Sequence, residues 1–287
     1  MLKKIIPVLI LFFIGIASAD AQVKYCLSGD CDNGKGMYRT DSNDLYEGDF
    51  NNGMFEGFGK MSFKNGDVFE GDWIRGLPKK GSYLFKNGDK YVGPINNFQA
   101  EGYGKMLFKN KDIYQGSYQN GKANGKGSLF KQNGLKYTGD FKDDKFDGKG
   151  IMTFPNGNVY DGDFVNNVRM GKCTYRFKSG AVYQGDYYKD DFNGTGTYLF
   201  PDKSLYTGFW LNGKRSGKGI YKYSSRSFYE GEFKNDLRSG YGKMVYENGN
   251  VYEGNWLNGK CNGKGSLRLA SGRILAGNFK DNALNSR

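Results

Sequence analysis

Aromatic residues and glycines alternate along the chain in a pattern that repeats. A Tyr-x-Gly unit recurs every 23 residues, with one step of 22, and in nine of ten units an aromatic residue follows two positions after the glycine. The units begin at Tyr46, Phe69, Tyr91, Tyr114, Tyr137, Tyr160, Tyr183, Tyr206, Tyr229 and Tyr252. Alternation with period two places side chains on one face of a β-strand. Each unit therefore predicts a strand such as 46–50, and its first residue is numbered position 0 below.

A second alternating run follows in each unit. Glycines stand at positions +11 and +13 and large residues at +15 and +17, as in residues 57–63, and an Asn-Gly turn such as Asn65-Gly66 often comes next. Asn-Gly favours the tight turn of a hairpin. Each unit therefore predicts a β-hairpin in which position 0 pairs with +15, +2 with +13 and +4 with +11. Glycine then faces glycine, and aromatic rings lie over them.

This 23-residue unit resembles the membrane occupation and recognition nexus (MORN) repeat. Ten units fill residues 46–274, a degenerate capping repeat fills 22–45 around Gly34-Lys35-Gly36, and 275–287 form a partial repeat. The resemblance implies an all-β fold, an elongated single-sheet array of consecutive antiparallel β-hairpins, twisted and curved, about 100 Å long. Departures at Lys79, Phe98 and Cys173 indicate local bulges or bends.

The resemblance also implies association with membranes, protein assembly and self-association. MORN repeats accompany lipid kinases and protein methyltransferases too, but here the repeats leave no room for such a domain. Histidine is absent, which excludes Ser-His-Asp triads and His-ligated metal sites. We expect a non-enzymatic binding or scaffolding protein with no cofactor, whose partner is another protein or a second copy in a homodimer. Carboxylate-dependent glycan hydrolysis stays open as a third hypothesis.

Residues 1–21 have the pattern of a secretory signal peptide. Lys3 and Lys4 precede a 13-residue apolar run, Ile5 to Ala17, and small residues allow cleavage after Ala21. We expect export to the periplasm or secretion, as a soluble or peripheral protein. The alternative interpretation is an N-terminal membrane anchor.

Charge adds a second candidate function. The net charge is +12, or +11 after cleavage, and lysines recur at position +12. This row could bind an anionic lipid surface or an envelope polyanion, whereas export argues against nucleic acid. Alternatively, these lysines pair with acidic residues at +3, as Asp140 with Lys149 inside one repeat. The candidate lysines are Lys126, Lys149, Lys172, Lys218 and Lys264.

Three aromatic residues stand at the lysine position instead. Phe58, Tyr103 and Tyr241 are expected on the polar face, where they are candidates for partner contact. The aromatics at +4 are expected in the core; sugar or base stacking is the alternative.

Four cysteines remain. Cys26 and Cys31 are expected to form a small disulfide loop that caps the first strand, because exported chains oxidise. A redox or metal pair is the alternative, but the C-x-x-C spacing is missing. We expect Cys173 as a small core residue and Cys261 as a free thiol in a loop. Residues 275–287 are expected to cap the other end.

Overall fold

The computed structural model describes residues 25–285, and the signal peptide expected at 1–21 lies outside them. The chain divides into two compact units between Asp147 and Gly148. All regular elements of the described residues are β-strands, and their pairings are antiparallel, so the all-β prediction is confirmed. No described helix could span a membrane.

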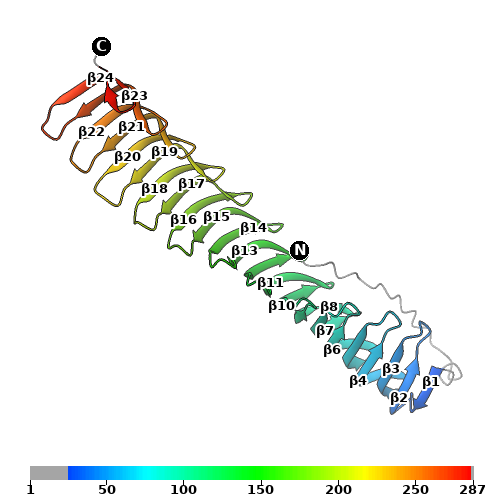
Figure 1. The fold of residues 1–287 in the computed structure, drawn as a ribbon. Coiled ribbons are helices and arrows are strands. Elements are labelled where there is room, and N and C mark those ends of the chain that lie inside the picture. Colours follow the sequence, from blue (N-terminus) through cyan, green and yellow to red (C-terminus); the bar gives the residue numbers. More distant parts are fainter. Residues whose placement is uncertain (1–24, 286–287) are drawn as a thin grey trace. The chain divides into compact units, whose positions relative to one another are not determined.

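The first unit consists of hairpins that lie side by side (Figure 1). Its strands are β1 (Cys26–Gly29), β2 (Lys35–Arg39), β3 (Leu45–Asn51), β4 (Met54–Ser62), β5 (Val68–Ile74), β6 (Leu77–Leu84), β7 (Lys90–Asn96), β8 (Gln99–Ala100), β9 (Gly102–Leu107), β10 (Ile113–Gln119), β11 (Lys122–Phe130) and β12 (Lys136–Lys142). Strand β13 (Lys145–Thr153) crosses the division between the units.

The second unit has the same construction (Figure 1). Its further strands are β14 (Val159–Val165), β15 (Val168–Arg176), β16 (Val182–Tyr188), β17 (Asp191–Leu199), β18 (Leu205–Leu211), β19 (Lys214–Lys222), β20 (Phe228–Lys234), β21 (Leu237–Val245), β22 (Val251–Leu257), β23 (Lys260–Arg268), β24 (Ile274–Lys280) and β25 (Ala283–Leu284).

The register inside a hairpin agrees with the expectation only over its first half. In β3 and β4, Tyr46 pairs with Met61 and Gly48 with Gly59, as expected for 0 with +15 and +2 with +13. The expected pairing of +4 with +11 is wrong, because Phe50 at +4 pairs with Phe55 at +9. Gly57 at +11 has φ of 61°, a conformation that glycine adopts without strain. The second strand therefore carries a bulge at +11 and +12.

The bulge redirects the residues at +11 and +12 to the next repeat. Gly57 pairs with Trp73, which is position +4 of the following unit, and Phe58 pairs with Asp72 at its +3. The second unit repeats the arrangement: the β14–β15 ladder skips Gly171 and Lys172, and β16 takes them up. Each second strand thus pairs with its own first strand on both sides of the bulge, and with the first strand of the next hairpin from +11 onward.

The core is built from the side chains at position 0. These ten residues are at most 1% exposed. The ring of Tyr46 lies over Gly48 and Gly59, where an added Cβ would come within 2.6 Å of the Tyr46 hydroxyl oxygen. In nine repeats the tyrosine hydroxyl donates to the backbone carbonyl at +3, as Tyr46 does to Asp49 at 3.0 Å. Glycine is needed at +2 and +13 because the ring occupies the side-chain space.

The turns between repeats are tied to the turns before them. Asp67 Oδ1 accepts a hydrogen bond from the Lys86 backbone N–H at 2.7 Å, and Asp44 binds the Lys64 N–H in the same way. The Asn-Gly turn is also present: the Gly66 N–H donates to the Phe63 carbonyl. These bonds satisfy backbone groups at the rim of the sheet and fix the spacing of successive hairpins.

The third repeat is the least regular. Phe98 stands where other repeats have glycine, aspartate or asparagine, with φ of 58°, and its ring contacts Trp73. The second strand of this repeat is broken into β8 and β9. This break lies close to Phe98, one of the positions where the sequence indicated a bulge or bend.

Candidate interaction surface

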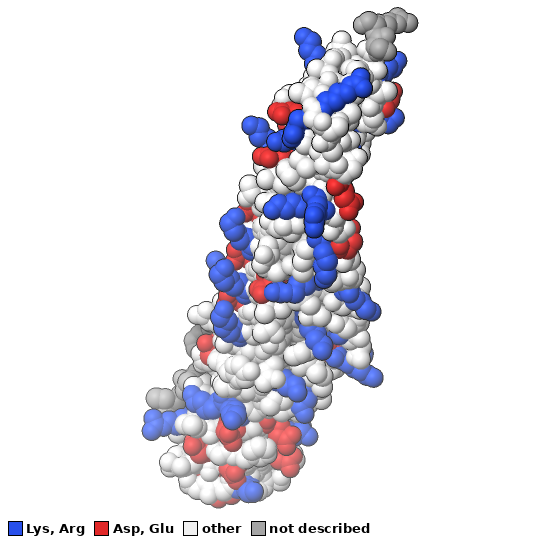
Figure 2. Space-filling view, turned by 90° about the vertical axis from the view of Figure 1, so that its left-hand side faces the viewer, with Lys and Arg blue, Asp and Glu red and all other residues white. Residues whose placement is uncertain are grey.

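The face of the sheet opposite to the position-0 rings is called the outer face here. It carries the side chains at +1, +3, +12 and +14. On the side that Figure 2 shows, basic and acidic side chains are interspersed along the molecule. The aromatics at +4 do not reach this face: Phe50, Trp73, Phe141, Phe164, Tyr187, Trp210, Phe233 and Trp256 are among the buried residues. They belong to the core.

The lysines at +12 face acidic residues of the following repeat. In the first unit Lys126 Nζ lies 2.7 Å from Asp140 Oδ1, and in the second unit Lys149 Nζ lies 3.0 Å from Asp163 Oδ1. The expected pairing inside one repeat was wrong in register, because the bulge at +11 and +12 hands each lysine to the next strand. These pairs are largely exposed and stabilise the sheet by only a few tenths of a kcal/mol each.

The remaining candidate lysines have different surroundings. Lys172 pairs with Asp186 at 2.5 Å, and this hydrogen bond lowers the pKa of the Asp186 carboxyl. Lys218 faces Glu232 in the ladder, and Lys264 faces Asn278. The ion pairs found among residues 25–285 include neither Lys218 nor Lys264. The lysine row therefore does not form one uniform basic track.

The three aromatics at +12 project from the outer face. Phe58 is 57% exposed, Tyr103 63% and Tyr241 55%. The Tyr241 hydroxyl donates to Glu253 at 3.1 Å, which holds the ring against the sheet. Phe58 faces Asp72 in the neighbouring strand. Such exposed rings are unusual on an otherwise charged face.

Two further apolar features of the second unit were missed from the sequence. Phe209 lies at +3, opposite Thr195, and is 40% exposed. At the hairpin tips, exposed apolar side chains recur at +5 or +8: Val165, Tyr188, Leu211, Leu237 and Leu257. Val165, Tyr188 and Leu211 are spaced by one repeat, but apolar residues at the tips replace no fixed residue type, so the sequence did not single them out.

A shallow groove crosses β15 to β18 on the outer face. Its floor includes Gly185, Gly196 and Gly208, and its walls include Thr174, Thr197 and Thr207. The Thr197 and Thr207 hydroxyls lie 3.1 Å apart within one hydrogen bond. Lys172, which pairs with Asp186, also lines the groove, so the groove offers a strip of hydroxyls beside Phe209 with one charged side chain at its edge.

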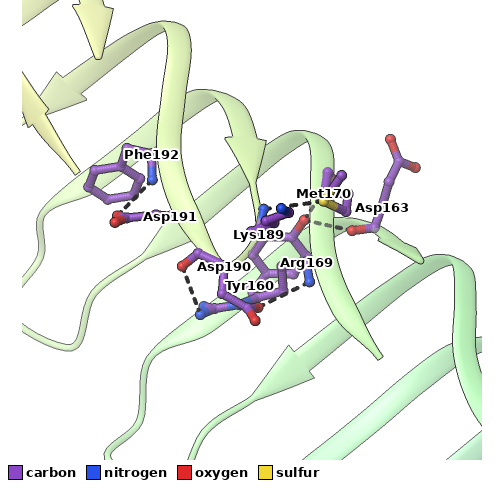
Figure 3. Close-up of polar contacts among 8 residues, drawn as sticks. All are labelled: Tyr160, Asp163, Arg169, Met170, Lys189, Asp190, Asp191 and Phe192. Atoms are coloured by element: carbon purple, nitrogen blue, oxygen red, sulfur yellow. Dashed lines mark hydrogen bonds and ion pairs between the residues drawn. The ribbon is translucent and has the colours of Figure 1, made fainter. Parts of the chain in front are cut away.

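The most polar part of the core is a caged guanidinium (Figure 3). Arg169 at +9 lies with its guanidinium carbon 5.3 to 5.8 Å from the centres of four rings, Phe154, Tyr160, Tyr175 and Tyr187. Its Nε donates to Asp190 Oδ1 at 2.8 Å. The hydrogen bond from Tyr160 to the Asp163 carbonyl closes the same cluster (Figure 3). Arg169 Nε and Nη2 and the Tyr160 hydroxyl are all bonded within the chain, so the cage serves the fold.

The cysteines agree with the expectation in three of four cases. Cys26 and Cys31 form a disulfide, with Cα atoms 6.0 Å apart. Cys173 is a buried free thiol, and burial raises its pKa to about 12. Cys261 is also a free thiol, but its expected loop position was wrong: it lies in β23 and is 3% exposed. Strand β23 begins at Lys260, so its second residue already points into the core.

No cluster of three or more Cys, Asp or Glu side chains suited to a metal ion occurs among the described residues. The described surface carries charge pairs, exposed rings and a strip of threonine hydroxyls.

A model of the MORN repeat matches nine segments of the sequence, 46–68, 69–90, 114–136, 137–159, 160–182, 183–205, 206–228, 229–251 and 252–272. The chain belongs to the MORN repeat family. MORN repeats are binding repeats, and the family is not an enzyme family. Residues 91–113, which the model leaves out, contain the broken strand of this MORN protein's third repeat.

The other proteins that were compared share little sequence or overall structure with this chain. No curated protein matches this MORN protein. Among solved structures, the TCP10 domain of Danio rerio CPAP in complex with a peptide of Danio rerio STIL has 13% identity and a TM-score of 0.34, over 86% of this chain and 96% of that one. The TCP10c domain of Drosophila melanogaster Sas-4 has 14% identity and a TM-score of 0.20, over 78% and 99%. At these TM-scores neither likeness informs the function.

Proposed function

We propose that this MORN protein is an exported, non-enzymatic scaffold that binds another protein, or a second copy of itself, through its outer face. The observation that carries the proposal is the exposure of Phe58, Tyr103 and Tyr241 at the lysine position. Aromatic residues are enriched in protein interfaces and dominate their binding energy. These rings take no part in the repeating core, since each lies on the face away from position 0.

Variants at one repeat position test this proposal with a built-in control. The triple variant F58A/Y103A/Y241A is compared with K126A/K149A/K172A, which changes three ion-paired lysines at the same +12 position. Partners are captured by crosslinking in the native host and quantified for each variant. We expect the aromatic variant to lose at least roughly tenfold in recovery of one specific partner, as loss of hot-spot rings predicts. Equal recovery of that partner from both variants would contradict the proposed role of the three rings in binding.

Export is the second part of the proposal. The positive residues and apolar run of residues 1–21 support it. Sequencing the N-terminus of the protein isolated from the periplasm or medium is expected to start at Gln22. An intact N-terminus in the membrane fraction would support the anchor instead.

Binding to an anionic lipid surface or envelope polyanion is the second candidate. It is favoured by the net charge of +12 and by Lys264, which faces an asparagine and not a carboxylate. Co-sedimentation of the mature chain with phosphatidylglycerol vesicles tests it. Binding that salt abolishes would support this role, because screening weakens exposed charge interactions. No binding at low salt would exclude it.

A further inference from the structure

Each end of the array holds one half of a repeat. At the N-terminal end, β2 pairs with β3 through Gly36 with Gly48 and Tyr38 with Tyr46. This is the register in which every second strand joins the following repeat, at +13 with +2 and +15 with 0. Strand β2 is therefore a second strand whose own first strand is missing from the pattern.

Among the described residues, the last repeat lacks most of its second half. Strand β24 pairs with β23 through Leu267 with Leu275 and Gly265 with Gly277. It is a first strand, with Leu275 at position 0. The short β25 pairs only with Phe279 and Lys280. The edge from Ile274 to Gly277 has no ladder partner on that side among the described residues, and Ile274 is 61% exposed.

In the N-terminal half-repeat, β1 and the disulfide loop stand where other repeats have a first strand with a tyrosine at position 0. Strand β1 takes the place of the first strand, with Cys26 opposite Tyr38 and Gly29 opposite Gly36. An added Cβ at Gly36 would lie 2.8 Å from Cys31 Sγ. In the full repeats the position-0 ring occupies this space, so the Cys26–Cys31 disulfide stands over Gly36 where a ring would otherwise lie.

The missing halves fit each other. The edge of β24 presents an apolar residue at 0 and glycine at +2, Leu275 and Gly277, and lacks a Gly-x-aromatic strand. Strand β2 is such a strand, Gly36-Met37-Tyr38. In the repeat register Leu275 would pair with Tyr38, Ala276 with Met37 and Gly277 with Gly36. An exposed strand edge is a template for this kind of pairing.

We propose that the edge of β24 binds strand β2 of a second copy, and that the Cys26–Cys31 disulfide blocks this head-to-tail pairing by keeping the β1 loop folded over Gly36 of β2. The inference deepens the self-association part of the proposed function and rests on it. Docking displaces two short segments, β1 and β25. Strand β1 is mostly exposed, and β25 has two ladder pairs, so both are weakly held.

The contact joins two different surfaces, so it is heterologous and extends into open chains unless one end is blocked. Opening of the head needs a dithiol reductant. Reduction adds two electrons and two protons to the disulfide and yields two thiols, while the reductant becomes a disulfide.

Sedimentation velocity of the full mature chain tests the proposal. We expect the disulfide-bonded protein to form no head-to-tail assemblies. The C26S/C31S variant is expected to form head-to-tail assemblies whose length increases with protein concentration. Adding L275D, which puts a charge at position 0 of the tail, is expected to return C26S/C31S to a monomer. The decisive sample mixes disulfide-bonded wild type with C26S/C31S/L275D, because each then has one open end: a 1:1 dimer is expected.

Other outcomes overturn the inference. A monomeric C26S/C31S whose circular dichroism and melting match the wild type would do so, as would chains that persist with L275D. A second head-open variant, the mature chain without residues 22–29, guards against misfolding of the serine variant, and it must also assemble. A dimer of the oxidised wild type that L275D leaves intact would overturn the end contact while leaving the outer-face scaffold in place.

Discussion

Two neighbouring repeats of the second unit fill the same core position with opposite chemistry. At +9, Phe192 stacks on Tyr183 with centroids 3.9 Å apart and planes inclined by 17°. The same position one repeat earlier holds Arg169, whose guanidinium lies among four rings and binds Asp190. Figure 3 shows both residues, Arg169 on β15 and Phe192 on β17. In these two repeats the site holds a flat group, a ring in one and a guanidinium in the other, whereas other repeats carry Ala123 or Cys261 at +9.

The difference lies in what each choice demands of the next repeat. A guanidinium brings a charge that must be neutralised in a half-buried place. Asp190 supplies the carboxylate for Arg169, and Asp236 does so for Arg215 at 3.2 Å. Arg238 has no aspartate at this place and donates to the Gly259 carbonyl at 2.7 Å, with its guanidinium carbon 4.3 Å from the Trp256 ring centre. The phenylalanine needs no such partner.

The largest predicted effect concerns the tyrosines beside both kinds of +9 residue. Burial raises the pKa of all nine position-0 tyrosines above 10.0, for example to about 12 in Tyr91. Above pH 10 the unfolded chain loses phenolic protons that the folded chain keeps, so the free energy of unfolding falls as pH rises. We expect a steep alkaline unfolding transition, in which circular dichroism and tyrosinate absorbance change together.

Arg169 refines this prediction. Its charge partly opposes the rise in the pKa of Tyr160, whereas no arginine acts on Tyr183. In the R169M variant the pKa of Tyr160 is expected to rise further, so its free energy of unfolding should fall more between neutral and alkaline pH than that of the wild type. Tyrosinate absorbance at fixed alkaline pH measures the unfolded fraction. Absorbance that rises near pH 10 without loss of structure would contradict the burial of these rings.

The repeat with the stacked Phe192 is expected to lose more stability on truncation than the repeat with the caged Arg169. F192A removes a ring that contacts Tyr183, Tyr187 and Trp210, and we expect a loss of about 3 kcal/mol in the free energy of unfolding. Urea denaturation measures it. The matched control is F209A on the outer face, expected to change stability by less than about 0.5 kcal/mol. Similar losses in both variants would contradict the assignment of faces.

The caged repeat is expected to depend on its pair as a unit. D190A leaves the Arg169 guanidinium half-buried without its carboxylate, which we expect to cost about 2 kcal/mol. The double variant R169F/D190N converts the cage into a stack and is expected to lie within about 1 kcal/mol of the wild type. Thermal melting compares the two. A double variant less stable than D190A would show that the cage needs a guanidinium and not simply a planar group.

The smallest effect is expected on the outer face. K172A removes the partner of Asp186, and the exposed pair is expected to contribute about 0.3 kcal/mol. Because the hydrogen bond lowers the pKa of Asp186, this contribution is present above the unfolded carboxylate pKa and is lost as pH falls through the folded one. Denaturation at neutral and acidic pH tests it, and the difference between K172A and wild type should vanish in acid.

Much of this fold could be predicted from the sequence, because the ten repeats can be compared with one another within one chain. The Tyr-x-Gly and Gly-x-Gly runs predict the strands, and the ring of Tyr46 over Gly48 and Gly59 follows from the spacing. The bulge at +11 does not follow, since a positive φ at Gly57 leaves the alternation of residue types unchanged. This is why the partner of Lys149 was assigned to the wrong repeat.

The candidate surface was less predictable than the core. The positions of Phe58, Tyr103 and Tyr241 broke a visible lysine pattern and so could be found. The apolar tips such as Leu211 and Leu257 replace no fixed residue type, so no broken pattern marked them. Cys261 was misplaced because strand ends depend on the hairpin register, which the bulge changes.

The hydrogen bonds that join each turn to the previous one have a consequence for how the chain folds. Asp67 reaches a backbone N–H 19 residues later, and other ties span 20 or 21 residues. The contacts therefore have low contact order for an all-β protein, which favours fast folding. Each hairpin contacts mainly its two neighbours, so the array can fold one repeat at a time.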